Sequence, residues 1–181
     1  TNVYSQWQSS KQDTRQWTIA GSSSAGGPLA EIGWNGGPIA GKNILTKTEG
    51  KNEFKITLNL YKGDQFQFCI QDAEGNWNTN DAEGGGARGG QYLEENEYMA
   101  APGTGLGDGQ VNITVNVSGN YTLTLTTDAD DKNVGAIMVV RNGDAPAVTI
   151  DRSDYTWYIY GNSKATTTTE SVLSGTNWGA E

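Results

Sequence analysis

The sequence contains no histidine and only one cysteine, Cys69. Histidine is the usual general base near neutral pH and the commonest metal ligand in proteins. Its absence excludes Ser-His-Asp catalysis, Cys-His catalysis and zinc sites that need a histidine ligand. Cys69 has no partner for a disulfide within the chain. Its position in the apolar and aromatic run Phe66–Ile70 indicates a small, buried strand residue.

Basic residues are scarce: 12 Lys and Arg stand against 21 Asp and Glu, which gives a formal net charge of −9. Proteins that bind nucleic acid or anionic membrane surfaces need clustered Lys and Arg to contact phosphates. The charge balance therefore argues against nucleic acid as a partner. No stretch approaches the roughly 18 consecutive apolar residues of a membrane-spanning helix, so we expect no membrane insertion.

The acidic cluster Asp128–Asn133 is the best candidate for a metal site in the sequence. Calcium loops alternate acidic residues around a central glycine, whereas this cluster has Lys132 inside it. The spacing therefore favours a solvated hairpin tip, and we expect neither a metal nor another cofactor.

Apolar and polar residues alternate with a period of two along most of the chain, which is typical of strands with one buried face. Polar turns at Lys62–Asp64 and Ser118–Asn120 each separate two such stretches, which predicts two hairpins. The pairs are Phe54–Leu60 with Phe66–Ile70 and Val111–Val117 with Tyr121–Leu125, and Gly135–Val140 is a further strand. The pattern predicts an all-β, antiparallel, immunoglobulin-like β-sandwich.

Two connections between the predicted strands are long and rich in glycine, residues 20–50 and residues 71–109. Long connections in a compact domain are usually functional or mobile. We expect Asp81–Gly109 to be mobile without a ligand, because its many glycines supply little rigidity.

A spaced motif in the N-terminal part of the chain recurs near the C-terminus. Trp17–Ala25 and Trp157–Ala165 both read Trp-x-Ile-x-Gly-x-Ser-x-Ala. A repeat of this period has the size of a domain, although a chance match of five positions is also possible. We therefore expect a terminal segment at 1–16, a sandwich at 17–145, and at 146–181 a linker with the opening strand and loop of a second module.

Trp17 and Trp157 have Ile two residues later, so we expect them in a core. Trp34 and Trp77 instead lie among Gly and Asn, which favours exposure over a role as loop anchors. An indole presents a flat apolar face that matches the C–H face of a pyranose ring, and amide side chains reach the ring hydroxyls. Trp, Tyr and Arg also anchor protein interfaces, so composition does not separate a sugar from a protein partner.

The order of several short motifs resembles the starch-binding β-sandwich modules of the SusE/SusF type, which occur in gut bacterial starch-capture proteins and in some amylases and pullulanases. The motifs are Trp17–Gly21, Gly33–Asn35, Phe66–Phe68, Trp77–Asn78 and Ser118–Leu123. The usual Lys between the two Phe residues of the third motif is Gln67 here. The resemblance implies an extracellular, secreted or surface-attached module that binds α-glucan without catalysis.

By these motifs the resemblance carries over only Trp34 and Trp77 as sugar contacts, and the adjacent Asn35 and Asn78 are further candidates. Arg88, Tyr92, Tyr98 and Lys42 are candidates from local composition alone. A neighbouring module or other starch-system proteins are possible partners, since linked weak sites gain avidity. Two alternatives stay open: a protein-adhesion or scaffold module, and a glycoside hydrolase that uses two of the carboxylates.

Overall fold

The computed structural model describes residues 11–70, 87–101, 111–131, 133–149 and 156. The chain divides into two compact units, Thr1–Val148 and Thr149–Glu181. All elements described below belong to the first unit. Trp77 and Asn78, the second copy of the repeat at Trp157–Ala165, and parts of the Asp81–Gly109 connection lie outside the described residues.

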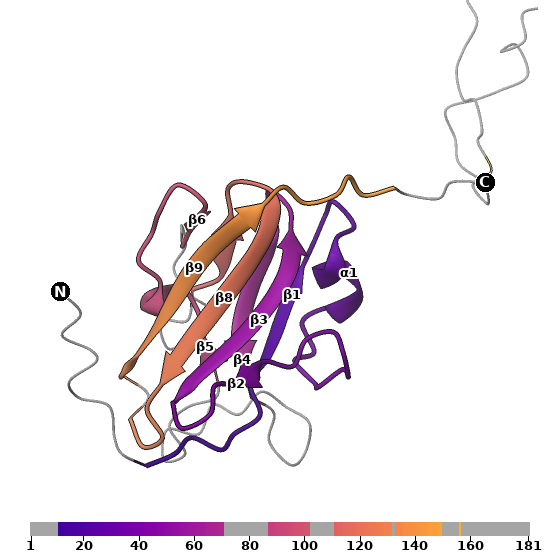
Figure 1. The fold of residues 1–181 in the computed structure, drawn as a ribbon. Helices are drawn as coiled ribbons and strands as arrows, with labels where there is room; N and C mark the ends of the chain where they lie inside the picture. The colour runs from indigo at the N-terminus through magenta and orange to yellow at the C-terminus, as the bar shows by residue number, and fades with distance from the viewer. Residues whose placement is uncertain (1–10, 71–86, 102–110, 132, 150–155, 157–181) are drawn as a thin grey trace, which may run out of the picture. The chain divides into compact units, whose positions relative to one another are not determined.

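The first unit is an all-β sandwich of two antiparallel sheets (Figure 1). A 4-stranded sheet has the order β2-β3-β8-β9, and a 5-stranded sheet has the order β1-β4-β7-β6 with β5 also paired to β4. The strands of the first sheet are β2 (Thr46–Lys47), β3 (Glu53–Leu60), β8 (Gly119–Thr127) and β9 (Gly135–Gly143). Those of the second are β1 (Thr18–Ser22), β4 (Gln65–Cys69), β5 (Ala87–Arg88), β6 (Met99–Ala100) and β7 (Ile113–Val115). The predicted antiparallel sandwich is confirmed.

The core lies between the two sheets and is built from the alternating apolar residues. Along β3 the buried positions are Phe54, Ile56, Leu58 and Leu60, with polar residues between them. β4 departs from this pattern, because Gln67 and Cys69 on its other face are buried as well. Burial raises the pKa of the Cys69 thiol to about 11, which fits a structural strand residue rather than a reactive thiol.

Both predicted hairpins are wrong, although the strands themselves form. β3 and β4 lie in different sheets, because β3 pairs with β8 while β4 pairs with β1. β7 and β8 likewise belong to different sheets. The two turns therefore carry the chain across the sandwich, and they are joined to each other. Gly63 N donates to Val115 O at 2.8 Å, and Lys62 N donates to Ser118 Oγ at 2.8 Å.

The β8–β9 connection is a true hairpin, with Asp128–Asn133 at its tip as expected. Asp128 is buried there, and its Oδ1 accepts from Asp130 N at 2.8 Å and from Asp131 N at 3.1 Å. Its carboxylate therefore shapes the turn. Within the described residues no group of three or more acidic or cysteine side chains is placed to hold a metal ion.

In the described part of the chain two short helices accompany the strands: α1 (Pro28–Ile32) between β1 and β2, and the 3₁₀ helix η3 (Gly90–Tyr92) after β5. α1 covers one margin of the sandwich beside β1 and β3 (Figure 1). The 3₁₀ helix, β5 and β6 occupy residues 87–101, where Leu93 and Met99 are buried in the core. This part of the predicted mobile connection is thus integral to the sandwich.

Candidate functional site

Trp34 stands on the loop that follows α1 and is 37% exposed. Three other large hydrophobic residues are exposed in the described part of the chain, and all three are aliphatic: Val117, Met138 and Val140. Trp17, by contrast, is fully buried, as the sequence predicted. Among these exposed residues of the described part of the chain, Trp34 is therefore the one aromatic side chain.

The loop that carries Trp34 is fixed to β1 at its first half. Gly33 closes α1 with φ of 68°, a left-handed conformation that favours glycine. Gly21 N then donates to Gly33 O at 2.9 Å. The hydroxyl of Thr18, a buried β1 residue, donates to Gly36 O at 2.6 Å. Trp34 thus lies between two backbone positions that are tied to the same strand.

Asn43 fixes the second half of the loop from inside the protein, where its side chain is fully buried. Its Oδ1 accepts from Ile39 N at 2.6 Å, and its Nδ2 donates to Gly37 O at 2.8 Å and to Ile19 O at 3.2 Å. The amide therefore satisfies two loop groups and one β1 carbonyl at once. A binding residue on such a loop is held in place before a ligand arrives, which lowers the entropic cost of binding.

Asn35 and Lys42 lie on this same loop, so the structure brings three predicted site residues onto one segment. Asn35 is exposed, and its Oδ1 accepts from Gly37 N at 3.1 Å in a local turn. Lys42 Nζ lies 2.7 Å from Glu31 Oε2, and both side chains are exposed. The hydrogen bond from Lys42 lowers the pKa of Glu31, so the Glu31 carboxylate is ionised near neutral pH.

Arg88 lies inside the domain and is only 1% exposed. Its guanidinium carbon sits 5.2 Å from the ring centre of Trp17 and 5.2 Å from that of Tyr92. Burial lowers the pKa of Arg88, as expected when a cation is removed from water. A guanidinium stacked between two rings is not a surface group, so we leave Arg88 out of the site proposed below.

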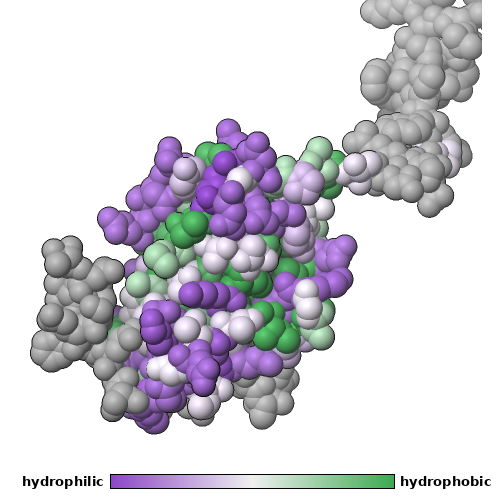
Figure 2. Space-filling view, in the orientation of Figure 1, coloured by the Kyte–Doolittle hydropathy of each residue, from purple (hydrophilic) through white to green (hydrophobic). Residues whose placement is uncertain are grey.

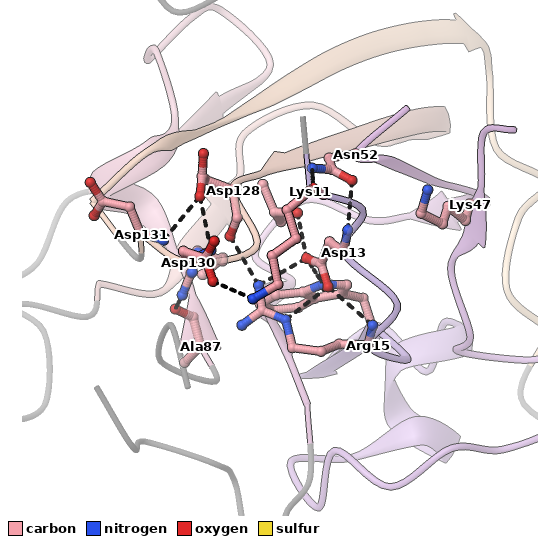
Figure 3. Close-up of polar contacts among 12 residues, drawn as sticks. Lys11, Asp13, Arg15, Lys47, Asn52, Ala87, Asp128, Asp130 and Asp131 are labelled. Atoms are coloured by element: carbon pink, nitrogen blue, oxygen red, sulfur yellow. Dashed lines mark hydrogen bonds and ion pairs between the residues drawn. The ribbon is translucent and has the colours of Figure 1, made fainter. Parts of the chain in front are cut away.

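A polar cluster beside Trp17, centred on the buried Asp13, ties the segment before β1 to the β8–β9 hairpin (Figure 3). The Asp13 carboxylate accepts from Arg15, from Trp17 Nε1 at 3.1 Å and from Thr127 Oγ1 at 2.5 Å. Burial raises the pKa of Asp13, but the hydrogen bonds from Arg15 and Thr127 outweigh it and leave the pKa below its usual value. Arg15 also lies 5.0 Å from the Trp17 ring centre, so this cluster serves packing.

Tyr92 and Tyr98 are half-buried and pack against the core. Tyr98 meets Tyr121 edge to face, with ring centres 6.1 Å apart. Tyr92 lines a groove of about 650 Å³ along the outer edge of β9, where Leu93 forms an isolated parallel bridge with Ile137. Glu94 and Glu95 line the same groove. These tyrosines belong to the segment 87–101 rather than to the Trp34 loop.

Sequence reasoning found the displayed residues of the loop but missed those that hold it. Thr18 and Asn43 are polar residues with full burial, which composition does not indicate. The sequence did offer one indication for Thr18, which is a polar residue among the apolar residues Trp17, Ile19 and Ala20 at the start of a strand. Glu31 was also missed, although it stands in the first turn of a short helix near Lys42.

Comparison with known proteins finds similarity to a solved structure only. No protein-family model matches it, and no curated protein matches it. Among solved structures, the crystal structure of SusF from Bacteroides thetaiotaomicron is similar, with a TM-score of 0.41 and 18% sequence identity. The match covers 72% of this chain and 25% of SusF, so the chain spans about a quarter of that protein.

A likeness at that TM-score carries no argument about function. The fold class rests on the strand pairing described above. No helix among the described residues is long and apolar enough to cross a membrane. What the residues themselves support is an all-β antiparallel sandwich that presents one tryptophan on a fixed loop.

Proposed function

We propose that this sandwich is a non-catalytic carbohydrate-binding module that holds α-glucan against Trp34. The observation that carries the proposal is the exposed indole on a loop fixed by Thr18 and Asn43. A flat ring that is held still can stack on the C–H face of a pyranose, and neighbouring Asn35 offers an amide for sugar hydroxyls. The choice of α-glucan rests on the motif resemblance in the sequence.

The site we propose comprises Trp34 and Asn35, together with Trp77 and Asn78, which lie outside the described residues. Tyr92 and Tyr98 stay predictions from local composition. Single sugar sites bind weakly, and a module of this kind gains from a linked neighbour. An extracellular or surface location, where polysaccharide is present, belongs to the same proposal.

Two other functions predict different behaviour of the protein towards starch. A scaffold module would use Trp34 against a protein and would ignore glucan. A glycoside hydrolase would need two carboxylates roughly 5–10 Å apart across a bound sugar. The groove beside Tyr92 holds the neighbouring Glu94 and Glu95, so release of sugar must be measured and not assumed absent.

A pull-down separates the three. The protein is mixed with insoluble starch, with cellulose as a control polysaccharide, and with maltoheptaose as a soluble competitor. The proposal predicts retention on starch, release by maltoheptaose and no increase in reducing sugar. Retention with sugar release would identify a hydrolase, and no retention on starch would contradict the proposal and leave the scaffold function.

A further inference from the structure

A second groove, of about 540 Å³, runs between α1 and the outer edge of β3, apart from the Trp34 and Asn35 side chains. Its size lies within the range of roughly 300–1,000 Å³ that is usual for small-molecule sites. β2 pairs with β3 only at Phe54 and Lys55, so the later part of β3 has no strand on that side. The lining residues that matter for a ligand are Glu31, Lys42, Thr57, Asn59, Tyr61 and Asn120.

One wall of the groove ends a row of hydrogen-bonded side chains on the solvent face of the 4-stranded sheet. Asn142 Nδ2 donates to Asn120 Oδ1 at 2.9 Å, and Asn120 Nδ2 donates to Asn59 Oδ1 at 2.8 Å. The hydrogen bonds therefore run in one direction, from Asn142 on β9 through Asn120 on β8 to Asn59 on β3. Such chains polarise one another, which strengthens the terminal donor. That donor is Asn59 Nδ2, which has no acceptor among the described residues.

Figure 2 shows the face of this sheet, where weakly polar and apolar residues fill much of the middle and hydrophilic residues lie around it. Thr57 and Thr122 join their hydroxyls at 2.9 Å beside the amide row. Thr57 lines the groove as well. The β3 wall thus presents an amide donor and a hydroxyl on a rigid sheet.

The opposite wall carries the ion pair between Lys42 and Glu31. An ammonium and a carboxylate side by side offer donors and acceptors with no net charge, which suits a pair of ligand hydroxyls. A cationic ligand would be repelled by Lys42, and an anionic ligand would be repelled by Glu31. Gly27 packs closely on the Tyr61 ring, and the Tyr61 hydroxyl donates to Pro146 O at 2.7 Å, so this ring is fixed as an apolar surface.

We propose that the groove between α1 and β3 is a second binding site for a neutral sugar, taking one or two hexose units between Asn59 and the Lys42–Glu31 pair. The identity of the sugar as a glucose unit rests on the proposed function. The groove itself does not, because its donors and acceptors suit any neutral vicinal diol. We expect about millimolar affinity, as for other ligands of this size.

The two sites can be observed separately by nuclear magnetic resonance. The protein is labelled with ¹⁵N and titrated with glucose, maltose and maltoheptaose up to tens of millimolar. Binding in the groove shifts the side-chain amide signals of Asn59, Asn120 and Asn142, whereas binding at the loop shifts the Trp34 indole signal. Asn59→Ala and Glu31→Gln should each weaken the groove response about tenfold and leave the Trp34 response unchanged. Val140→Ala, on the same sheet face but outside the groove, is the matched control.

Each outcome decides between the two proposals. Shifts at Trp34 without shifts at the three amides overturn the groove site and leave the proposed function standing. Shifts at the amides without shifts at Trp34 support the groove and overturn the loop site. Amide shifts that persist in Asn59→Ala and Glu31→Gln at wild-type affinity would place the sugar elsewhere and overturn the groove. If none of the three sugars shifts any of these signals, both proposals fail.

Discussion

Trp34 owes its position to polar residues beneath it, and Thr18 is the clearest example. The Thr18 hydroxyl is buried and donates to Gly36 O at 2.6 Å, and Thr18 is the first residue of β1. A buried hydroxyl at the start of a strand is costly unless it is satisfied. Here it is satisfied by the backbone of the binding loop, so stability and site geometry depend on the same side chain.

We therefore predict that Thr18→Val weakens glucan binding although the sugar does not contact Thr18. Valine keeps the shape but leaves Gly36 O with only the weak Cys69 thiol donor at 3.8 Å, at a cost of about 1–3 kcal/mol in unfolding free energy. Urea unfolding and calorimetric titration with maltoheptaose give the two quantities. Unchanged affinity in a destabilised variant would show that the loop holds Trp34 without this hydrogen bond.

Asp13 gives a pH-dependent contribution whose sign follows from its environment. The pKa of Asp13 is lowered in the folded protein, where Arg15 and Thr127 hydrogen bond to its ionised form. Its stabilisation is therefore complete above the unfolded pKa of about 3.9 and is lost as pH falls through the lower folded pKa. Asp13→Asn should lower the unfolding free energy at pH 7 by about 1.5–3 kcal/mol.

Urea unfolding of wild type and Asp13→Asn at pH 7 and near pH 3 checks this. The difference between the two proteins should shrink at the lower pH, because Asp13 is then largely protonated in the unfolded wild type and part of the stabilisation from its lowered folded pKa is lost. Taking the difference cancels the other carboxylates, which titrate in both proteins. A difference that stays constant across this range would mean that the charge of Asp13 contributes nothing.

At the scale of elements, the close approach of β1 to β4 explains one glycine of the repeated motif. β1 pairs with β4 from Thr18 opposite Cys69 to Ser22 opposite Gln65. A Cβ on Gly21 would collide with the Gln65 carbonyl oxygen and press on Leu29 of α1. Only glycine lets this strand pair while α1 packs over it.

Gly21→Ala should therefore destabilise the domain by about 1–3 kcal/mol, the usual cost of overpacking. Gly143→Ala is the matched control, because a Cβ there meets nothing within 4 Å and its φ is not left-handed. Thermal unfolding of both variants is the measurement. Equal midpoints for Gly21→Ala and wild type would show that β1 and β4 adjust freely at this position.

The strands could be predicted from the sequence, but their partners could not. Alternation along Phe54–Leu60 fixes which side of β3 is buried. It does not say whether the polar turn at Lys62–Asp64 returns the chain to the same sheet or crosses to the other. That choice depends on distant segments, since β8 occupies the edge of β3 that a hairpin would have used.

The candidate site shows the same division. Exposure of Trp34 followed from its glycine and asparagine neighbours, which offer nothing apolar to pack against. Arg88 also has glycine neighbours, yet it is buried, because Trp17 and Tyr92 supply two ring faces from other parts of the chain. Local composition cannot show partners that are brought in by the fold.

At the scale of the whole molecule, the residues of the first motif copy have structural roles that a second copy would repeat. Trp17 and Ile19 are fully buried, Gly21 permits strand pairing, and Ser23 Oγ accepts from Gly27 N at 3.0 Å. We keep the hypothesis that Trp157–Ala165 opens a second, similar sandwich. Within the described residues, the segment after β9 meets the first sandwich at Pro146, whose carbonyl accepts from the Tyr61 hydroxyl, and at Val148, beside Gly26.

A protein that ends at Thr149 should therefore fold by itself with the unfolding midpoint of the first unit unchanged, and should still bind starch. Circular dichroism during heating, with starch retention, is the measurement, and the full chain is the control. A shortened protein that does not fold would mean that Trp157 and Ile159 belong to the first core. The proposed domain boundary would then be wrong.

The central claim is that Trp34 on its fixed loop binds α-glucan. Isothermal titration of maltoheptaose into wild type, Trp34→Ala and the control Val140→Ala tests it most directly. Loss of one stacked aromatic should cost about 1–3 kcal/mol of binding free energy, by analogy with base stacking on aromatic side chains. This corresponds to a dissociation constant that is roughly 5- to 150-fold higher. The account predicts this loss in Trp34→Ala alone, with all three unfolding midpoints equal. Wild-type affinity in Trp34→Ala would contradict it.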